Sequence, residues 1–206
     1  MNVSNLTTPE TILDFWFGST PDDTVVAKEQ ADLDLWWSKN KATDDEIRRR
    51  FEIYLILAVS EQLNDWLSTP RGRLALIILT DQFPRNIYRD TARAFSCDEK
   101  ALTWCIEGLE KKVDRELGLI ERVFFYLPLE HGEYIEHQDL SVKCFSELAA
   151  DVPGEQKSIF EDYLSYAIRH REIIERFGRF PHRNKVLGRE STPEELAFLS
   201  EPGSSF

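Results

Sequence analysis

Apolar side chains recur at alternating spacings of three and four along most of the chain, which is the pattern of helices that bury one face. The clearest stripe precedes Gly178, and glycine readily adopts the left-handed conformation that ends helices. A second stripe follows Thr43 and Glu46, whose spacing predicts a capping box at a helix start. The first stripe comprises Phe160, Tyr163, Ala167, His170, Ile174 and Phe177, and the second comprises Ile47, Phe51, Tyr54, Leu55, Ala58, Gln62 and Trp66.

Three of the threonine–proline pairs mark further helix starts, because proline at the first helical position loses no hydrogen bond. They are Thr8-Pro9, Thr69-Pro70 and Thr192-Pro193, and Gly18 is expected to end the first of these helices. The run 74–79, after the second pair, is apolar on every side. This predicts a helix at the centre of the fold.

The middle of the chain continues the helical pattern. Ser96 with Glu99 predicts a cap before an apolar stripe at 102–113, and a helix over 117–127 is expected to end or kink at Pro128. Another helix is expected over 133–149, and no segment alternates apolar and polar residues in the manner of a strand. The pattern therefore predicts a single all-α domain, residues 1–206, built from consecutive antiparallel helix pairs with short connections.

Composition and charge restrict the class of protein. Of the 206 residues, 42% are hydrophobic and 12% are aromatic, so the chain can bury a core. A net charge of −12 argues against non-specific binding to nucleic acid or to an anionic membrane surface. The apolar runs are too short to span a bilayer and the N-terminus lacks the pattern of a signal peptide, so we expect a cytoplasmic protein. The three cysteines have no paired spacing, which predicts neither disulfides nor a structural zinc site.

Positive charge gathers in two segments that nearly repeat one another. The first reads Phe83-Pro84-Arg85-Asn86, and the second reads Phe180-Pro181-His182-Arg183-Asn184. Between residues 71 and 93 five arginines stand against two aspartates, and between residues 169 and 189 seven basic residues stand against two glutamates. In a chain this acidic, such segregation predicts a local site for an anion.

These segments also carry a family resemblance. The matching motifs are Leu-Thr-Asp-Gln-Phe-Pro-Arg-Asn at 79–86, Ala94-Phe95, Pro128-Leu129-Glu130-His131, Phe-Gly-Arg-Phe-Pro-His-Arg-Asn at 177–184, and Leu187-Gly188-Arg189. Together they resemble a bacterial family, domain-of-unknown-function family 924, over nearly the whole chain. Gly132 departs from the family pattern, which has serine there. The resemblance implies a tetratricopeptide-like helical bundle or short superhelix, and it implies no activity.

The repeated motif has two interpretations. Asp81 continues an apolar helix face, so it is expected to be partly buried, and Arg85 at the next turn can pair with it inside the fold. Alternatively, Arg85 faces a ligand, because its planar guanidinium donates two parallel hydrogen bonds to a carboxylate or a phosphate. Arg183 has the same two interpretations. If both segments lie side by side, the pocket consists of Arg85, Asn86, His182, Arg183 and Asn184.

Histidines supply the acid–base candidates. His131 follows Glu130 in a predicted loop or helix start, and His182 lies inside the second motif. His170 lies within an apolar stripe and is expected in the core, whereas His137 is expected on a solvated helix face. Metal-binding spacings such as His-Glu-x-x-His and the glycine-rich nucleotide motifs do not occur, so neither a metal nor another cofactor is expected.

Three functions follow from these candidates. The first is a helical protein that binds a small anionic metabolite or a peptide carboxylate at the two Arg-Asn motifs. The second is an enzyme that uses the same anion clamp, with His131 and His182 as acid and base, one of them oriented by Glu130 or Asp81. The third is an interaction scaffold in which both motifs only pin the fold.

Overall fold

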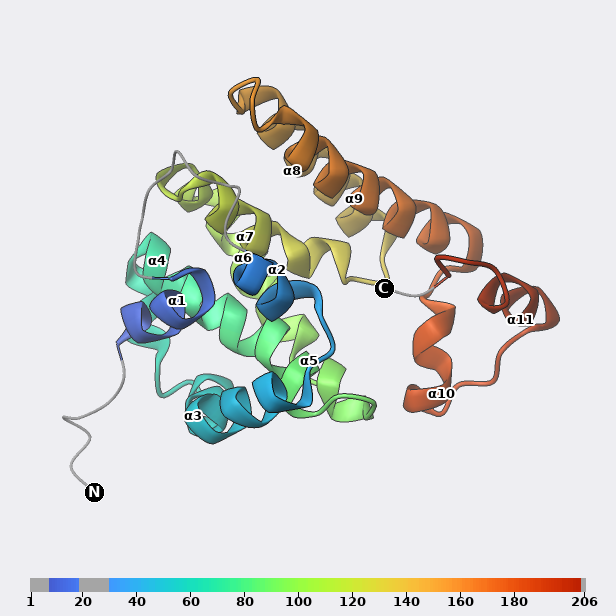
Figure 1. The fold of residues 1–206 in the computed structure, drawn as a ribbon, viewed down its shortest axis with the longest axis horizontal. Coiled ribbons are helices and arrows are strands. Elements are labelled where there is room, and N and C mark those ends of the chain that lie inside the picture. The colour runs from blue at the N-terminus through green and yellow to red at the C-terminus, as the bar shows by residue number, and fades with distance from the viewer. Residues whose placement is uncertain (1–7, 19–29, 205–206) are drawn as a thin grey trace.

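The computed structural model describes residues 8–18 and 30–204, which form an array of packed helices (Figure 1). The protein is 75% helical and contains no strand within those ranges, which confirms the all-α prediction. The helices are α1 (Pro9–Phe17), α2 (Gln30–Trp37), α3 (Lys41–Val59), α4 (Pro70–Ile77), α5 (Phe83–Ile87), α6 (Asp98–Glu110), α7 (Leu119–Glu130), α8 (Ile135–Asp151), α9 (Lys157–Phe177), α10 (Asn184–Leu187) and α11 (Pro193–Leu199).

The centre of the fold is α4 together with the π-helical turn Ile78–Gln82 that continues it. Every residue from 74 to 79 is 0% exposed, which confirms the central position predicted from the run of apolar residues. Helices α1, α6 and α7 pack around α4. Aromatic rings fill the space between these helices, with Trp16 edge-on to both Phe83 and Phe124 at centroid distances of 5.5 and 5.6 Å.

The predicted helix starts at the threonine–proline pairs are confirmed, since α1, α4 and α11 begin at Pro9, Pro70 and Pro193. Thr69 accepts a hydrogen bond from the Gly72 amide, and Thr192 forms a capping box with Glu195. Gly178 ends α9 with φ of 66°, the left-handed conformation expected there.

Two predicted caps were wrong by a few residues. Helix α3 begins at Lys41, because the side chain of Asn40 accepts hydrogen bonds from the next amides and caps the helix earlier than Thr43 would. Helix α6 begins at Asp98 with Cys97 in the cap position, and the Ser96 hydroxyl bonds back to the Arg93 carbonyl instead. In both places an alternative hydrogen-bond partner nearby in the chain decided the boundary.

Helix α7 runs through Pro128 to Glu130, two residues beyond the expected end or kink. A proline in the last turn removes a single intrahelical hydrogen bond, and the tight packing of this helix offsets that loss. The continuation places Glu130 and His131 at the end of a fully buried helix turn.

The C-terminal part of the chain packs on a second, smaller apolar cluster. Helices α8 and α9 form an antiparallel pair, and α10 and α11 follow the end of α9 at one side of the molecule (Figure 1). Ile173, Ile174 and Phe180 form the buried cluster there, separate from the main core. This arrangement holds the second basic motif against the connection between α7 and α8. Within residues 8–18 and 30–204, no helix combines the length and apolarity of a membrane crossing.

We expect Leu76→Ala to lower the free energy of unfolding by about 2–5 kcal/mol, because the site at the centre of α4 cannot collapse around the missing atoms. The measurement is urea denaturation followed by circular dichroism. Ile56 is 51% exposed on α3 and provides the matched control, for which Ile56→Ala should change stability by less than about 0.5 kcal/mol. Equal costs at both positions would contradict a core centred on α4.

Candidate functional site

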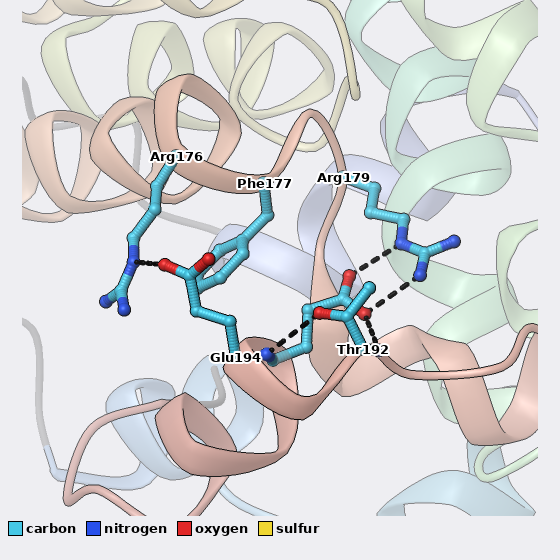
Figure 2. Close-up of a pocket in the computed structure, with 6 residues that line it drawn as sticks. Arg176, Phe177, Arg179, Thr192 and Glu194 are labelled. Atoms are coloured by element: carbon cyan, nitrogen blue, oxygen red, sulfur yellow. Dashed lines mark hydrogen bonds and ion pairs between the residues drawn. The ribbon is translucent and has the colours of Figure 1, made fainter.

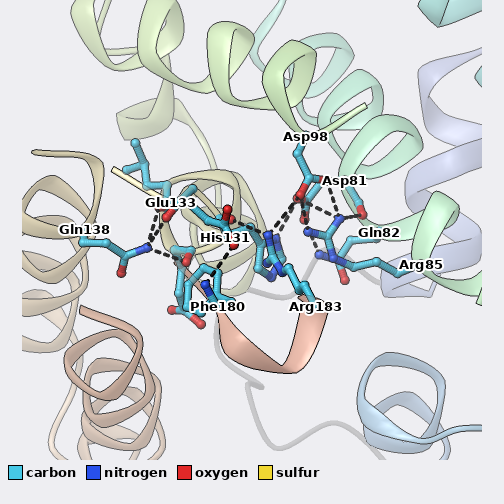
Figure 3. Close-up of polar contacts among 12 residues, drawn as sticks. Asp81, Gln82, Arg85, Asp98, His131, Glu133, Gln138, Phe180 and Arg183 are labelled. Atoms are coloured by element: carbon cyan, nitrogen blue, oxygen red, sulfur yellow. Dashed lines mark hydrogen bonds and ion pairs between the residues drawn. The ribbon is translucent and has the colours of Figure 1, made fainter. Parts of the chain in front are cut away.

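The site begins at the π-helical turn, which places Asp81 inside the protein. Such turns interrupt the regular helix and occur often at functional sites. Asp81 is 0% exposed, and its Oδ1 lies 2.7 Å from Nδ1 of His131 and 3.3 Å from Nη1 of Arg85 (Figure 3). The buried carboxylate therefore has both the predicted arginine partner and a histidine partner on another helix.

Gln138 holds the backbone of the segment that carries His131. This side chain, 0% exposed on α8, donates hydrogen bonds to the carbonyls of Glu130 and Gly132, each at 2.7 Å (Figure 3). These hydrogen bonds fix the backbone of the connection between α7 and α8, so His131 contacts Asp81 from a rigid turn.

Asp98 connects the two basic motifs. As the first residue of α6, it accepts two hydrogen bonds from the Arg85 guanidinium, at 3.0 and 3.1 Å. Its Oδ2 also lies 3.6 Å from Nη1 of Arg183 (Figure 3). The two arginines, which are distant in sequence, therefore meet at one carboxylate of the chain itself.

Arg183 is the more constrained of the two arginines, with only 6% of its surface exposed. Its guanidinium carbon packs over the rings of Phe95 and Phe180, 4.7 and 4.5 Å from their centroids. Nη1 donates to the carbonyl of His131 at 3.0 Å, whereas Nε is buried without a hydrogen-bond partner among the described residues. Burial, followed by the charge of Arg85, lowers the pKa of Arg183 to about 10.

Phe180 brings two further histidines to the site. Its ring is edge-on to His170 at 5.5 Å and tilted to His182 at 5.6 Å. His170 is buried on the α9 stripe as expected, and its Nδ1 donates to the Tyr166 carbonyl at 2.9 Å. The same nitrogen lies 3.2 Å from Oε1 of the buried Glu130.

Burial shifts the pKa values of these groups toward their neutral forms. It raises the pKa of Glu130 to about 8, with a further contribution from the charge of Asp81. Burial also lowers the pKa of His170 to about 3 and that of His182 to about 4. The pKa of His131 is lowered as well, by burial and then by Arg85. At neutral pH the site therefore contains a protonated carboxyl and neutral imidazoles.

Asp81 behaves in the opposite way to Glu130. Burial opposes its ionisation, but the charge of Arg85 and the contacts with His131 keep its pKa below the ordinary range. Two carboxyl groups in one site thus have opposite protonation at neutral pH. Divergent pKa values of this kind are a common feature of binding and catalytic sites.

The two asparagines of the repeated motifs do not join this site. Asn86 donates to Asp44 on α3 at 2.9 Å, and Arg89 completes that contact with two hydrogen bonds of 2.7 Å to the same carboxylate. Asn184 faces Ser191 and Glu195 near α11. Each asparagine sits one residue past its arginine on a helical turn, so it points to a different neighbour.

Three residues of the site were not among the sequence candidates: Asp98, Phe95 and Phe180. Phe95 lies in the Ala94-Phe95 motif and Phe180 opens the second basic motif, so both belonged to segments already singled out. The signal for Asp98 was weaker, namely an acidic residue in the first turn of a predicted helix. Glu133 also takes a structural role here, accepting the Phe180 amide at 2.8 Å and two hydrogen bonds from Arg189.

An open hollow of 340 Å³, with no histidine in its lining, lies near the start of α11 (Figure 2). Arg179 donates two hydrogen bonds to Glu195 across it, at 2.6 and 2.8 Å, and Arg176 pairs with Glu194 at 3.0 Å. These arginines already have carboxylate partners, so the hollow is a weaker candidate than the site around Arg183. In the described part of the chain, no group of three or more histidine, cysteine or acidic side chains is placed to hold a metal ion.

The fold and this cluster define a class: an all-helical protein in which two arginine motifs and three histidines meet around a buried acidic pair. The chain belongs to the family of bacterial proteins of unknown function DUF924, whose model matches residues 12–203. It is similar to the solved structure of the protein of unknown function ATU0120 from Agrobacterium tumefaciens, with 36% sequence identity and a TM-score of 0.77. That match covers 93% of this chain and 96% of the other. No curated protein matches the sequence.

The raised pKa of Glu130 predicts a fall in stability with rising pH. The folded protein keeps a proton on Glu130 up to about pH 8, whereas an unfolded carboxyl releases it near 4.5. The stabilisation that Glu130 gives the folded state is therefore fully present below its unfolded pKa. It is lost as the pH rises through its folded pKa. His170 and His182 act in the opposite direction, but only below about pH 6.5.

Between pH 6.5 and 8 we expect the melting temperature of the wild type to fall more steeply than that of Glu130→Gln. A single linked proton can change the free energy of unfolding by at most about 1.4 kcal/mol per pH unit. Differential scanning calorimetry across this range measures the slope. Glu136→Gln, at an exposed position on α8, is the control and should leave the slope unchanged. Identical slopes in Glu130→Gln and the wild type would show that Glu130 is already ionised.

Proposed function

We propose that the protein binds a small anion, a carboxylate or phosphate carried by a metabolite or by a peptide, at the guanidinium of Arg183. The observation that carries the proposal is the buried Nε of Arg183, which has no hydrogen-bond partner among the described residues. The guanidinium carbon packs against the rings of Phe95 and Phe180, so its planar faces are occupied by aromatic contacts and an anion would bind at its edge. Nη1 is already bonded to His131, which leaves the edge formed by Nε and Nη2.

That edge suits a carboxylate or a phosphate. Its two N–H groups are parallel and match two oxygens of an anion in a bidentate contact. A buried donor without a partner costs about 1–3 kcal/mol, and an anion would recover that cost. The anion would also offset the repulsion between Arg183 and Arg85, which contributes to the lowered pKa of Arg183.

Arg73 offers a useful comparison, because its Nε is also buried without a partner. Its Nη1 donates to the Trp104 carbonyl at 2.8 Å and lies 3.4 Å from Glu107. A nearby carboxylate of this kind would repel an incoming anion. Arg183 also lies 3.6 Å from a carboxylate, but that carboxylate, Asp98, is shared with Arg85. The second positive charge of Arg85 favours an anion, so Arg183 is the better anion site.

We expect sulfate, phosphate or citrate to raise the melting temperature of the wild type at constant ionic strength. A ligand at one hundred times its dissociation constant stabilises the folded state by about 2.7 kcal/mol. Arg183→Gln should abolish this shift, and Arg183→Lys should reduce it, because lysine keeps the charge without the fork.

The matched control is Arg179→Gln, which removes an arginine of the same segment whose fork is already bonded to Glu195. It should respond to the anions as the wild type does. If none of these anions, nor a short peptide with a free carboxylate, raises the melting temperature, the motifs only pin the fold and the interaction scaffold becomes the better interpretation.

An acid–base enzyme is the second candidate, and the contact between Asp81 and His131 favours it. A carboxylate that accepts the Nδ1 proton orients the imidazole and leaves Nε2 to take a proton from a substrate. We expect His131→Gln to abolish any turnover of chromogenic phosphate or carboxylate esters while sulfate binding persists. Equal turnover by His131→Gln and the wild type would remove this candidate.

A further inference from the structure

We propose that the site takes up a proton on His131 when its anion binds, so that anion binding and proton binding favour one another. This inference rests on the proposed function and adds to it a dependence on pH and a preferred ligand contact. Three observations carry it: the orientation of the His131 imidazole against Asp81, the backbone hydrogen bond that links His131 to Arg183, and the charged groups that face His131.

The first observation is the orientation of the imidazole. In the neutral form Nδ1–H donates to Asp81 at 2.7 Å, and Nε2 carries the lone pair. Nε2 has no hydrogen-bond partner among the described residues, and 15% of the His131 side chain is exposed. A proton arriving on Nε2 would turn this nitrogen into a donor for an anion, while the Asp81 carboxylate would balance the new charge.

The second observation is the backbone position of His131. It is the C-terminal cap of α7, and its amide donates to the Leu127 carbonyl at 2.9 Å. The C-terminal end of a helix favours a positive charge. The carbonyl of the same residue accepts a hydrogen bond from Arg183. The position of His131 and that of the Arg183 guanidinium, whose edge is proposed to bind the anion, therefore depend on one another.

The third observation is the balance of the groups that face His131. Asp81 and Asp98 favour its protonation, whereas burial and Arg85 oppose it and keep the pKa below the ordinary value. Glu130, which precedes it on α7, is protonated at neutral pH and adds little charge. The remaining facing groups are His170 on α9, and His182 and Arg183 in the second motif.

A bound anion would shift this balance toward the charged imidazole. A unit negative charge about 5 Å away at an effective dielectric constant of about 20 raises a pKa by about two units. Anion binding therefore favours the protonated form of His131. The preferred ligand is therefore an anion with an oxygen free to accept from Nε2–H, in addition to the oxygens bound by Arg183.

The experiment is isothermal titration of the full chain with sulfate, which does not itself titrate between pH 5.5 and 7.5. Titrations in two buffers with different ionisation enthalpies measure the protons taken up on binding. We expect an uptake approaching one proton and a dissociation constant that rises with pH by up to about tenfold per unit, the limit for one linked proton.

His131→Gln should still bind sulfate, but without proton uptake and with little pH dependence. Glu130→Gln is the control for the neighbouring titratable group and should keep the uptake. Wild-type binding without proton uptake would overturn this inference alone, as would uptake that persists in His131→Gln and disappears in His182→Gln. Failure of sulfate to bind at any pH would overturn this inference, and failure of phosphate, citrate and the carboxylate peptide as well would overturn the proposed function with it.

Discussion

The carboxylate of Asp98 is the contact on which the arrangement of the site depends. Two guanidinium groups would repel one another if they approached across a low-dielectric space, and a carboxylate between them makes the approach favourable. Arg85 binds Asp98 with both arms of its fork, and Arg183 completes the contact from the other side. Because Asp98 begins α6, this contact ties the start of that helix to both repeated motifs at once.

The groups around this contact are buried. With Arg183 packed against Phe95 and Phe180, water has little access to the histidines packed around Phe180. Low access to water disfavours charge, so the imidazoles stay neutral and Glu130 keeps its proton. The acid–base properties of the cluster are thus a consequence of its packing, in which one buried phenylalanine positions two histidines and an arginine.

The two motifs that are alike in sequence make partly different contacts in the structure. Arg85 and Arg183 converge, but Asn86 turns to Asp44 on α3, and Asn184 turns to Glu195 on α11. Each motif therefore has one residue directed to the site and one residue that fastens the motif to its own neighbourhood. The asparagines therefore match the internal-pin interpretation of the motif, whereas the anion-site interpretation concerns the arginines alone.

The sequence by itself determined the helical class and the central position of residues 74–79. It also determined where the helices that follow threonine–proline begin and that α9 ends at Gly178. These features depend on local hydrogen bonding and on the spacing of apolar residues, which a chain displays directly. The partners of the charged residues were decided only by the tertiary structure. Asp81 could be assigned to Arg85 at the next helical turn, but its contact with His131 joins residues that are remote in sequence and therefore depends on how α7 packs beside the π-helical turn. The partners of Asp98 were likewise decided by the tertiary structure. Electrostatic pairing depends on distances in space, and the spacing of residues along the chain does not give these distances.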